Sequence, residues 1–442
     1  MGGNQGPEPR LEPRIRNSTR PAAGSGPGAA RKRGHAGEQD GAYPDAGPGQ
    51  ARSVEFDDEV VPENDFLQPG EKRTAAPARG FVDGQYWLAI LGSDPIVTRM
   101  PAPIPSSSNP QPPRSFAELL TLMQPSLRAL DALLREQVAH FEPEVQEIAA
   151  YCLESTGKRL RPILVFLSGW CGSTAPDPGL VRAAAVIEMA HLATLVHDDI
   201  MDHAVLRRGR ATVSAKDGPS VAVLLGDALF AQSVWLSTQF PDSEVCRGVS
   251  AAMRQVCTGE IIQTLSGPQA QPSRERYRRI IDLKTAELFH VSCRLGARLA
   301  GHPGEFVAAA GDFGRRLGVA YQIYDDLTDF VASSAAAGKT LGTDWESGKL
   351  TLPVLLLLDR VPEPERAGIL AGLRSGTAQV GGEITRRMAA AGVFVDVAAE
   401  VHREIATART ALAPWSAHAA SGMLLELATY LEGQLNGLPL LP

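Results

Sequence analysis

From Ser115 to the C-terminus, apolar residues recur at the spacing of an α-helix in one segment after another. The first segment opens with Ser-Phe-Ala-Glu, the pattern of a helix capping box, and Leu127, Leu130 and Leu134 follow at helical intervals. The pattern is broken by proline and glycine clusters at 176–179, 267–268, 302–304 and 362–364. The intervening segments run roughly 20 to 28 residues, as in large helical bundles. We therefore predict an all-α fold.

Residues 1 to about 114 have a different composition, rich in Gly, Pro, Ala and Arg. Such a segment buries too little apolar surface to offset the entropy of ordering, so we expect a disordered extension before an ordered domain over 115–442. Met100 precedes a proline-rich stretch and is an alternative start, with an over-extended reading frame before it. Glu8 and Glu12 interrupt the Arg-rich region, which argues against a mitochondrial transit peptide.

Charge and cysteine content restrict the partners and the compartment. The net charge of -7 provides no overall positive field, so we expect neither nucleic acid nor anionic lipid as a partner. The five cysteines are widely spaced, without the close pairs of a zinc site or disulfide framework, which indicates reduced thiols in a cytoplasmic protein. No uncharged apolar stretch approaches the roughly 18 to 20 residues of a membrane span, so none is expected.

Two aspartate motifs lie inside the predicted helices. The first is DDIMD at 198–202 and the second is DDLTD at 325–329, with carboxylates at Asp198, Asp199, Asp202, Asp325, Asp326 and Asp329. Residues i and i+4 share one helix face, so each motif presents a pair of carboxylates in one direction. Both motifs follow apolar runs, which is unusual for a solvated acidic face. Hard oxygen ligands of this kind suit magnesium, which binds one or two carboxylates together with substrate phosphates.

Basic residues alternate with these acids along the chain. They lie in GKRLRP at 157–162, RRG at 207–209, Lys-Thr at 284–285, and Gly-Lys at 338–339 and 348–349. Any one of them alone would be an ordinary solvated loop. Together with the acids they suggest a different arrangement: carboxylates with magnesium hold one diphosphate, and arginine and lysine clamp a second.

In this order and near this spacing, the motifs resemble those of the trans-isoprenyl diphosphate synthases, or polyprenyl synthetases, over about 115–442. The resemblance implies an isoprenoid synthase-type bundle with a central apolar cavity, a homodimer, and two to three Mg²⁺ ions per site. It implies head-to-tail addition of isopentenyl diphosphate to an allylic diphosphate, giving an all-trans polyprenyl diphosphate and pyrophosphate. One departure is Ala211, where many members have proline.

The resemblance also implies roles for individual residues. Those expected to bind isopentenyl diphosphate are Lys158, Arg161, His191 and Arg208. Those expected to bind the allylic diphosphate are Arg207, Lys284, Thr285, Gln322 and Lys339. Lys349, slightly off the family spacing, is expected to bind substrate, with no diphosphate assigned to it. Asp198, Asp202 and Asp325 would hold magnesium, and the six motif aspartates with Lys284 form the expected catalytic set.

Small residues precede the first motif on its helix. Ala190, Ala193 and Thr194 lie one and two turns before Asp198, where short-chain family members carry bulk. Each prenyl unit needs about one helical turn of depth, so the open positions predict a product of about C30 to C50, a quinone side-chain precursor. Alternatively, these residues are ordinary helix-packing residues, another helix closes the cavity, and the product is short, about C15 to C20.

Three other functions compete with this one. Glu-x-x-His occurs at 188–191 and 287–290, as in di-iron carboxylate bundles, but that function gives no role to the basic loops. A class I terpene cyclase would share the fold, although its second metal motif normally mixes Asn, Ser or Thr with Glu. A non-catalytic subunit of a heteromeric synthase would tend to lose aspartates, and none is missing here.

Overall fold

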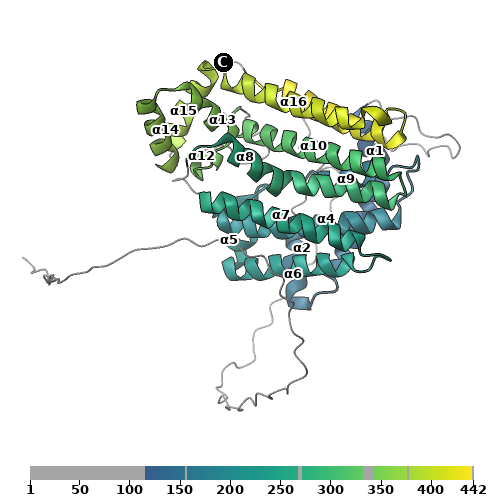
Figure 1. Ribbon diagram of the computed structural model, residues 1–442. Coiled ribbons are helices and arrows are strands. Elements are labelled where there is room, and N and C mark those ends of the chain that lie inside the picture. Colours follow the sequence, from purple (N-terminus) through teal and green to yellow (C-terminus); the bar gives the residue numbers. More distant parts are fainter. Residues whose placement is uncertain (1–114, 155–156, 267–270, 332–342, 376–377, 441–442) are drawn as a thin grey trace, which may run out of the picture. The chain divides into compact units, whose positions relative to one another are not determined.

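The computed structural model describes residues 115–154, 157–266, 271–331, 343–375 and 378–440, which form a bundle of α-helices (Figure 1). The expectations for 1–114, for Met100 and for Lys339 lie outside these residues. The long helices are α1 (Phe116–Val138), α4 (Pro178–Met201), α6 (Pro219–Ser237), α7 (Glu244–Ser266), α9 (Glu287–Leu299), α10 (Gly304–Val331), α16 (Val393–Leu412) and α17 (Ala419–Asn436). The shorter ones are α2 (Pro143–Glu154), α3 (Leu160–Ser168), α5 (Val213–Asp217), α8 (Arg274–Ile281), α12 (Thr343–Glu346), α13 (Leu352–Arg360), α14 (Glu363–Ser375) and α15 (Ala378–Ala390). The predicted all-α fold is confirmed.

Short elements of other kinds connect some of the helices. Strands β1 (Leu206–Arg207) and β2 (Arg210–Ala211) pair antiparallel and place Arg208 and Gly209 at the turn between them. A π-helical turn (Asp282–Ala286) joins α8 to α9, and a 3₁₀ turn (Ala413–Trp415) follows α16. The π-helical turn contains the Lys-Thr pair that the sequence placed on a helix.

The predicted helix starts are capped by their own side chains. Ser115 Oγ accepts a hydrogen bond from the Glu118 amide at 3.3 Å, as the capping box predicts. At the second start, Asp177 Oδ1 accepts from the Leu180 amide at 2.9 Å, and Pro178 occupies the first turn of α4. The breaks at 176–179 and 302–304 therefore fall between helices, as expected, whereas Pro125 lies inside α1.

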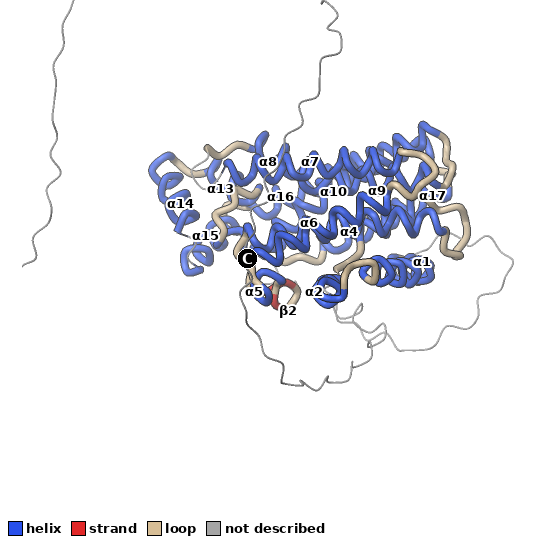
Figure 2. Tube along the Cα trace, turned by 90° about the horizontal axis from the view of Figure 1, so that it is seen from below, coloured by secondary structure: helices blue, strands red, loops and turns tan. Residues whose placement is uncertain are grey.

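The motif helices lie in the middle of the bundle. Helix α10 packs between α9 and α16, and α4 packs against α6 and α3 (Figures 1 and 2). Residues 183–190 of α4 are all buried, which requires neighbours on every side of the helix. Both aspartate motifs are therefore carried by helices that tertiary packing holds firmly.

Two helices in the described part are long and apolar enough to cross a membrane by length and composition, namely α4 and α6. Charged residues interrupt both helices, Arg182 and Glu188 in α4 and Asp227 in α6, so neither contains an uncharged stretch of about 18 residues. In the apolar stretch of 18 residues in α4, 72% is buried inside the bundle, as in the core helix of a folded domain. In the corresponding stretch of α6 only 39% is buried. Helix α6 therefore leaves much of its apolar surface uncovered.

Candidate functional site

The six motif aspartates divide into two groups by exposure. Asp199, Asp326 and Asp329 are buried, whereas Asp198 and Asp325 are half-buried and Asp202, at the end of α4, is exposed. The less buried group consists of the three residues expected to hold magnesium. The arrangement on two helices thus leaves one set of carboxylates accessible and encloses the other.

The buried carboxylates bond to protein groups. Arg207 Nε donates to Asp199 Oδ1 at 2.6 Å, which ties the β1 strand to the first motif. Asp329 Oδ2 accepts from the backbone amide of Asp344 at 3.1 Å and so holds the start of α12 beside α10. These two aspartates therefore connect the motifs to the segments that follow them.

Lys284 lies between two acids on different helices. Its Nζ is 3.7 Å from Asp198 Oδ2 and forms an ion pair with Glu260 on α7. Burial raises the pKa of Asp198 to about 6; Lys284 acts in the opposite direction, and Glu260 and Asp202 raise the pKa further. Crowded carboxylates with a raised pKa form a site that gains from an added cation, and all the donors are hard oxygens, which fits magnesium. Sequence reasoning missed Glu260, because nothing in its spacing relates α7 to either motif.

A chain of hydrogen bonds joins the Lys-Thr pair to the second motif. Thr285 Oγ1 donates to Gln322 Oε1 at 2.7 Å, and Gln322 Nε2 donates to Asp326 Oδ1 at 2.7 Å. On its other side, Asp326 Oδ2 accepts from the Tyr277 hydroxyl at 2.7 Å. The structure thus brings together Thr285 and Gln322, which the sequence assigned to one ligand, and adds Tyr277, which it did not single out.

The two basic loops meet at the N-terminal end of α3. Arg161 Nη1 and His191 Nε2 are 2.9 Å apart, and burial together with Arg161 holds the pKa of His191 well below its usual value. The Arg208 guanidinium packs so closely on Gly157 that a Cβ there would displace it. Lys158 follows directly and is exposed. Of the residues expected to bind isopentenyl diphosphate, Lys158 and Arg208 lie on two loops that touch, whereas Arg161 is on α3 and His191 is on α4.

Arg159 anchors the first of these loops. It is buried in left-handed backbone with φ 49°, and its Nη1 donates to Glu188 Oε1 on α4 at 2.6 Å, with Asp131 of α1 at 3.4 Å from Nη2. Arg208 also has left-handed backbone, with φ 53°. Non-glycine residues adopt this conformation only where their surroundings hold them there, which is frequent at functional sites.

The Glu-x-x-His pairs have other partners. Glu188 binds Arg159, and Glu287 binds Arg315. Within the residues that the structure describes, no three His, Cys, Asp or Glu side chains group closely enough to hold a metal ion by themselves. Both glutamates of the di-iron pattern are thus paired with arginines, whereas magnesium would complete its shell with substrate phosphates and water.

Lys349 lies beside the first motif. Its Nζ is 3.1 Å from Asp202 Oδ2 and 4.0 Å from Asp344 Oδ1. Burial alone would lower the pKa of Lys349, but Asp344 and Asp202 together raise it above its usual value. The structure thus connects this lysine to the acids of the site, and its contact with a diphosphate stays a prediction.

The small residues before the first motif are enclosed by the bundle. Ala190 and Ala193 are buried, and Thr194 Oγ1 donates to the His191 carbonyl at 2.7 Å. A cavity of about 610 Å³ lies elsewhere, between α8, α10, α13 and α16. Its lining includes Tyr277 and Ile323 together with charged residues such as Arg274 and Glu400. A channel beside Ala190 and Ala193 stays a prediction.

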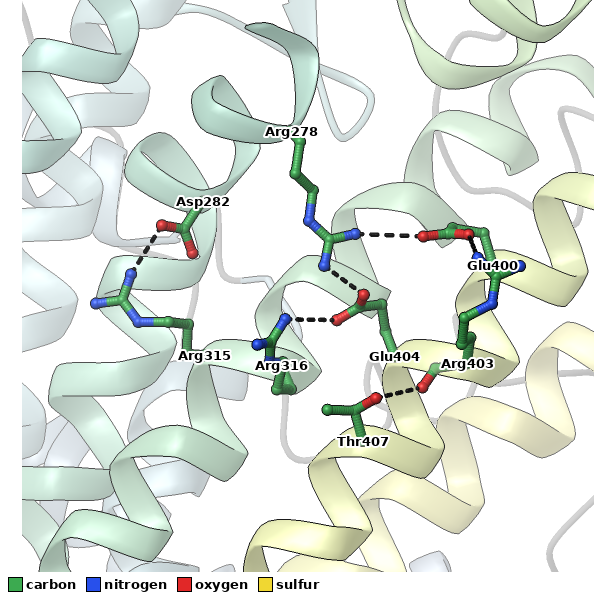
Figure 3. Close-up of polar contacts among 8 residues, drawn as sticks. All are labelled: Arg278, Asp282, Arg315, Arg316, Glu400, Arg403, Glu404 and Thr407. Carbon is green, nitrogen blue, oxygen red and sulfur yellow. Dashed lines mark hydrogen bonds and ion pairs between the residues drawn. The ribbon is translucent and has the colours of Figure 1, made fainter. Parts of the chain in front are cut away.

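Ion pairs join α16 and the π-helical turn to α10 (Figure 3). Glu404 on α16 lies between Arg278 of α8, which it binds, and Arg316 of α10, whose Nη1 is 3.5 Å away. Arg315 of α10 binds Asp282 at 2.9 Å and also binds Glu287, the residues at the start of the π-helical turn and directly after it. These contacts fix the helix that carries Lys284 and Thr285 against the helix that carries the second motif.

The helical bundle and its two aspartate motifs define an isoprenoid synthase-type protein. More particularly, the chain belongs to the polyprenyl synthetase family, whose model matches residues 142–382. It is 36% identical over 244 residues to heptaprenyl diphosphate synthase component 2 of Bacillus subtilis, covering 55% of this chain and 70% of the relative. It is 32% identical over 245 residues to octaprenyl diphosphate synthase of Haemophilus influenzae, covering 54% and 73%.

Solved structures of both long- and short-chain enzymes share the fold. A decaprenyl diphosphate synthase from Rhodobacter capsulatus aligns with a TM-score of 0.67 at 32% identity, over 72% of this chain and 99% of that one. A geranylgeranyl pyrophosphate synthase from Lactobacillus brevis aligns with a TM-score of 0.65 at 27% identity, over 73% and 100%. The fold alone therefore does not separate the two product classes.

Proposed function

We propose that this protein is a magnesium-dependent prenyltransferase that adds isopentenyl diphosphate to an allylic diphosphate and gives an all-trans polyprenyl diphosphate. The observation that carries the proposal is the difference in burial among the six motif aspartates. Asp198, Asp202 and Asp325 are the less buried three, and Lys284 lies beside Asp198. Two touching basic loops at 157–162 and 207–209 supply a second place for a diphosphate. The relatives named as polyprenyl diphosphate synthases support the same reaction.

Each part of the site has a separate task in this reaction. Magnesium, held by Asp198, Asp202 and Asp325, would neutralise charge on the departing pyrophosphate. Lys284, Thr285 and Gln322 orient the allylic diphosphate, with Arg207 and Lys349 beside it. Arg161, Arg208 and Lys158 hold isopentenyl diphosphate alongside, so that proximity supplies much of the rate. The pKa of His191 lies well below its usual value, so the ring stays neutral; its Nε2 can accept a hydrogen bond from Arg161, which leaves Nδ1–H as a donor.

The reaction is tested with the full chain, magnesium, labelled isopentenyl diphosphate and allylic primers of several lengths. We expect labelled polyprenols of about C30 to C50 after dephosphorylation, sized by reversed-phase chromatography, and no incorporation in excess chelator. Cyclic hydrocarbons formed from the primer alone would indicate a terpene cyclase instead. No product with any primer would contradict the proposal and leave a dependent subunit as the alternative.

Product length should respond to bulk at Ala193. Replacing Ala193 by phenylalanine would place a ring on the buried face of α4, where we propose that the growing chain passes. We expect shorter products, by about one or two prenyl units, since each unit needs about one helical turn of depth. Overpacking costs about 1 to 3 kcal/mol, so a melting temperature accompanies the product sizes. Unchanged product lengths in a folded variant would mean that this position only packs helices.

We further propose that two copies associate through α6 and α7. The exposed apolar side chains there are Val223, Leu224 and Trp235 on α6 and Ile261 and Leu265 on α7. A patch of this kind on adjacent helices marks a protein interface more often than free surface. The name of the Bacillus relative, component 2, makes a different partner chain the main alternative.

Leu224, which is 68% exposed, tests this interface. We expect Leu224→Glu to convert a dimer into a monomer in sedimentation velocity, because a buried unpaired charge costs several kcal/mol at an interface. Val395 on α16 is 44% exposed and provides a matched control, so Val395→Glu should leave the dimer intact. A wild-type chain that sediments as a monomer would contradict the proposed pairing.

A further inference from the structure

Tyr277 is buried on α8 with its hydroxyl directed at the second aspartate motif. The hydroxyl donates to Asp326 Oδ2 at 2.7 Å, and Asp326 is itself buried. A buried tyrosine hydroxyl usually finds a partner, but a motif carboxylate is a specific one. The contact links a residue outside every motif to the helix that carries Asp325.

The bond from Tyr277 is the first of three in a row. Asp326 Oδ1 accepts from Gln322 Nε2, and Gln322 Oε1 accepts from Thr285 Oγ1, each at 2.7 Å. An amide has distinct donor and acceptor ends, so this pattern fixes which way the Gln322 amide faces. With both oxygens of Asp326 engaged, the orientation of Gln322 and Thr285 depends on where Asp326 is held.

The π-helical turn makes this row of bonds possible. Tyr277 and Thr285 are eight residues apart and would point about 80° apart on a regular α-helix. A π-helical turn takes up one extra residue, so both side chains face α10. Arg315 of α10 binds Asp282 and Glu287 around this turn, which holds it in place (Figure 3 shows the bond to Asp282).

We propose that Tyr277 is a positioning residue for the allylic-diphosphate and magnesium side of the site. It acts through Asp326, which sets the Gln322 amide and the Thr285 hydroxyl and steadies the turn of α10 that carries Asp325. The inference rests on the proposed prenyltransferase function. It predicts that the two substrates respond differently to loss of the hydroxyl, because Lys158, Arg161 and Arg208, proposed for isopentenyl diphosphate, lie outside this row of bonds.

Tyr277→Phe tests the proposal, since it keeps the buried ring and removes only the hydroxyl. We expect kcat/KM for the allylic diphosphate to fall about 10- to 100-fold, the size expected for a lost bond to a charged group. The KM for the allylic diphosphate and the magnesium concentration at half-maximal rate should rise, while the KM for isopentenyl diphosphate changes by less than about twofold. The matched control is Tyr430→Phe, because the buried Tyr430 hydroxyl has no hydrogen-bond partner among the described residues. We expect its kinetics to equal those of the wild type.

The outcomes separate the inference from the proposed function. Unchanged kinetics in Tyr277→Phe, or an equal loss for both substrates at an unchanged magnesium requirement, would overturn the positioning role. If thermal melting shows that Tyr277→Phe does not fold, Asp326→Asn replaces it, because asparagine cannot accept from both Tyr277 and Gln322. The same split between substrates is then expected, and its absence overturns the role. A wild-type enzyme without any condensation activity would instead remove the proposed function, and the inference with it.

Discussion

Asp198→Asn should lower kcat about 10²- to 10³-fold while leaving the fold intact. The substitution keeps the shape of the side chain but removes a charge that lies 3.7 Å from Lys284 and that we propose binds magnesium. Losses of this size are typical when one preorganised electrostatic contact to the developing charge is removed. Steady-state kinetics at saturating magnesium measure the effect, and circular dichroism shows whether the helices persist.

Asp312 on α10 provides the control for this substitution. It is an exposed aspartate on the helix that carries the second motif. Asp312→Asn changes the net charge equally, so we expect it to retain wild-type kcat. If both variants lost activity to the same degree, overall charge would explain the result and Asp198 would have no special role.

Arg159→Met should destabilise the fold by about 3 to 5 kcal/mol. Arg159 and Glu188 form a buried ion pair. Removing the guanidinium therefore leaves the Glu188 carboxylate buried in the protein core without its main partner. Urea unfolding followed by circular dichroism measures the change. The double variant Arg159→Met with Glu188→Met should recover most of the loss, because the unpaired charge is then gone as well.

An exposed ion pair provides the comparison for Arg159. Arg386 and Glu383 on α15 pair at 2.7 Å with side chains 79% and 53% exposed. Arg386→Met should change the free energy of unfolding by less than about 0.5 kcal/mol. A loss below 1 kcal/mol in Arg159→Met, comparable with this control, would mean that water reaches Glu188 and that the pair does not anchor the loop.

Much of the fold could be predicted from the sequence because helical periodicity and capping are local. The Ser115 cap is formed as its sequence pattern indicates, and the motifs lie on α4 and α10. The uncovered apolar surface of α6 was missed. Its composition matches that of a core helix, and only the arrangement of neighbouring helices shows which face has no partner.

The sequence predicted those residues of the site that belong to recognisable motifs. The aspartates and basic loops follow one another in a recognisable order, but Glu260 and Tyr277 belong to no motif. Tyr277 and Asp326 are 49 residues apart, and no periodic pattern connects such positions. Asp325 and Asp326 are also buried to different degrees, which depends on how α10 packs against its neighbours. Two adjacent aspartates in a sequence do not show which of them will be buried.

The π-helical turn makes the length of this part of the chain as important as its residues. If this segment were a regular α-helix of the same length, everything before Asp282 would be turned by about 100° relative to α9, because the π-helical turn takes up one extra residue. Tyr277 would then swing away from α10 even though every side chain of the site was still present. A one-residue deletion in this turn, which restores an ordinary helix with Tyr277 and Thr285 on one face, should therefore be tolerated better than a one-residue insertion, which would turn Tyr277 away.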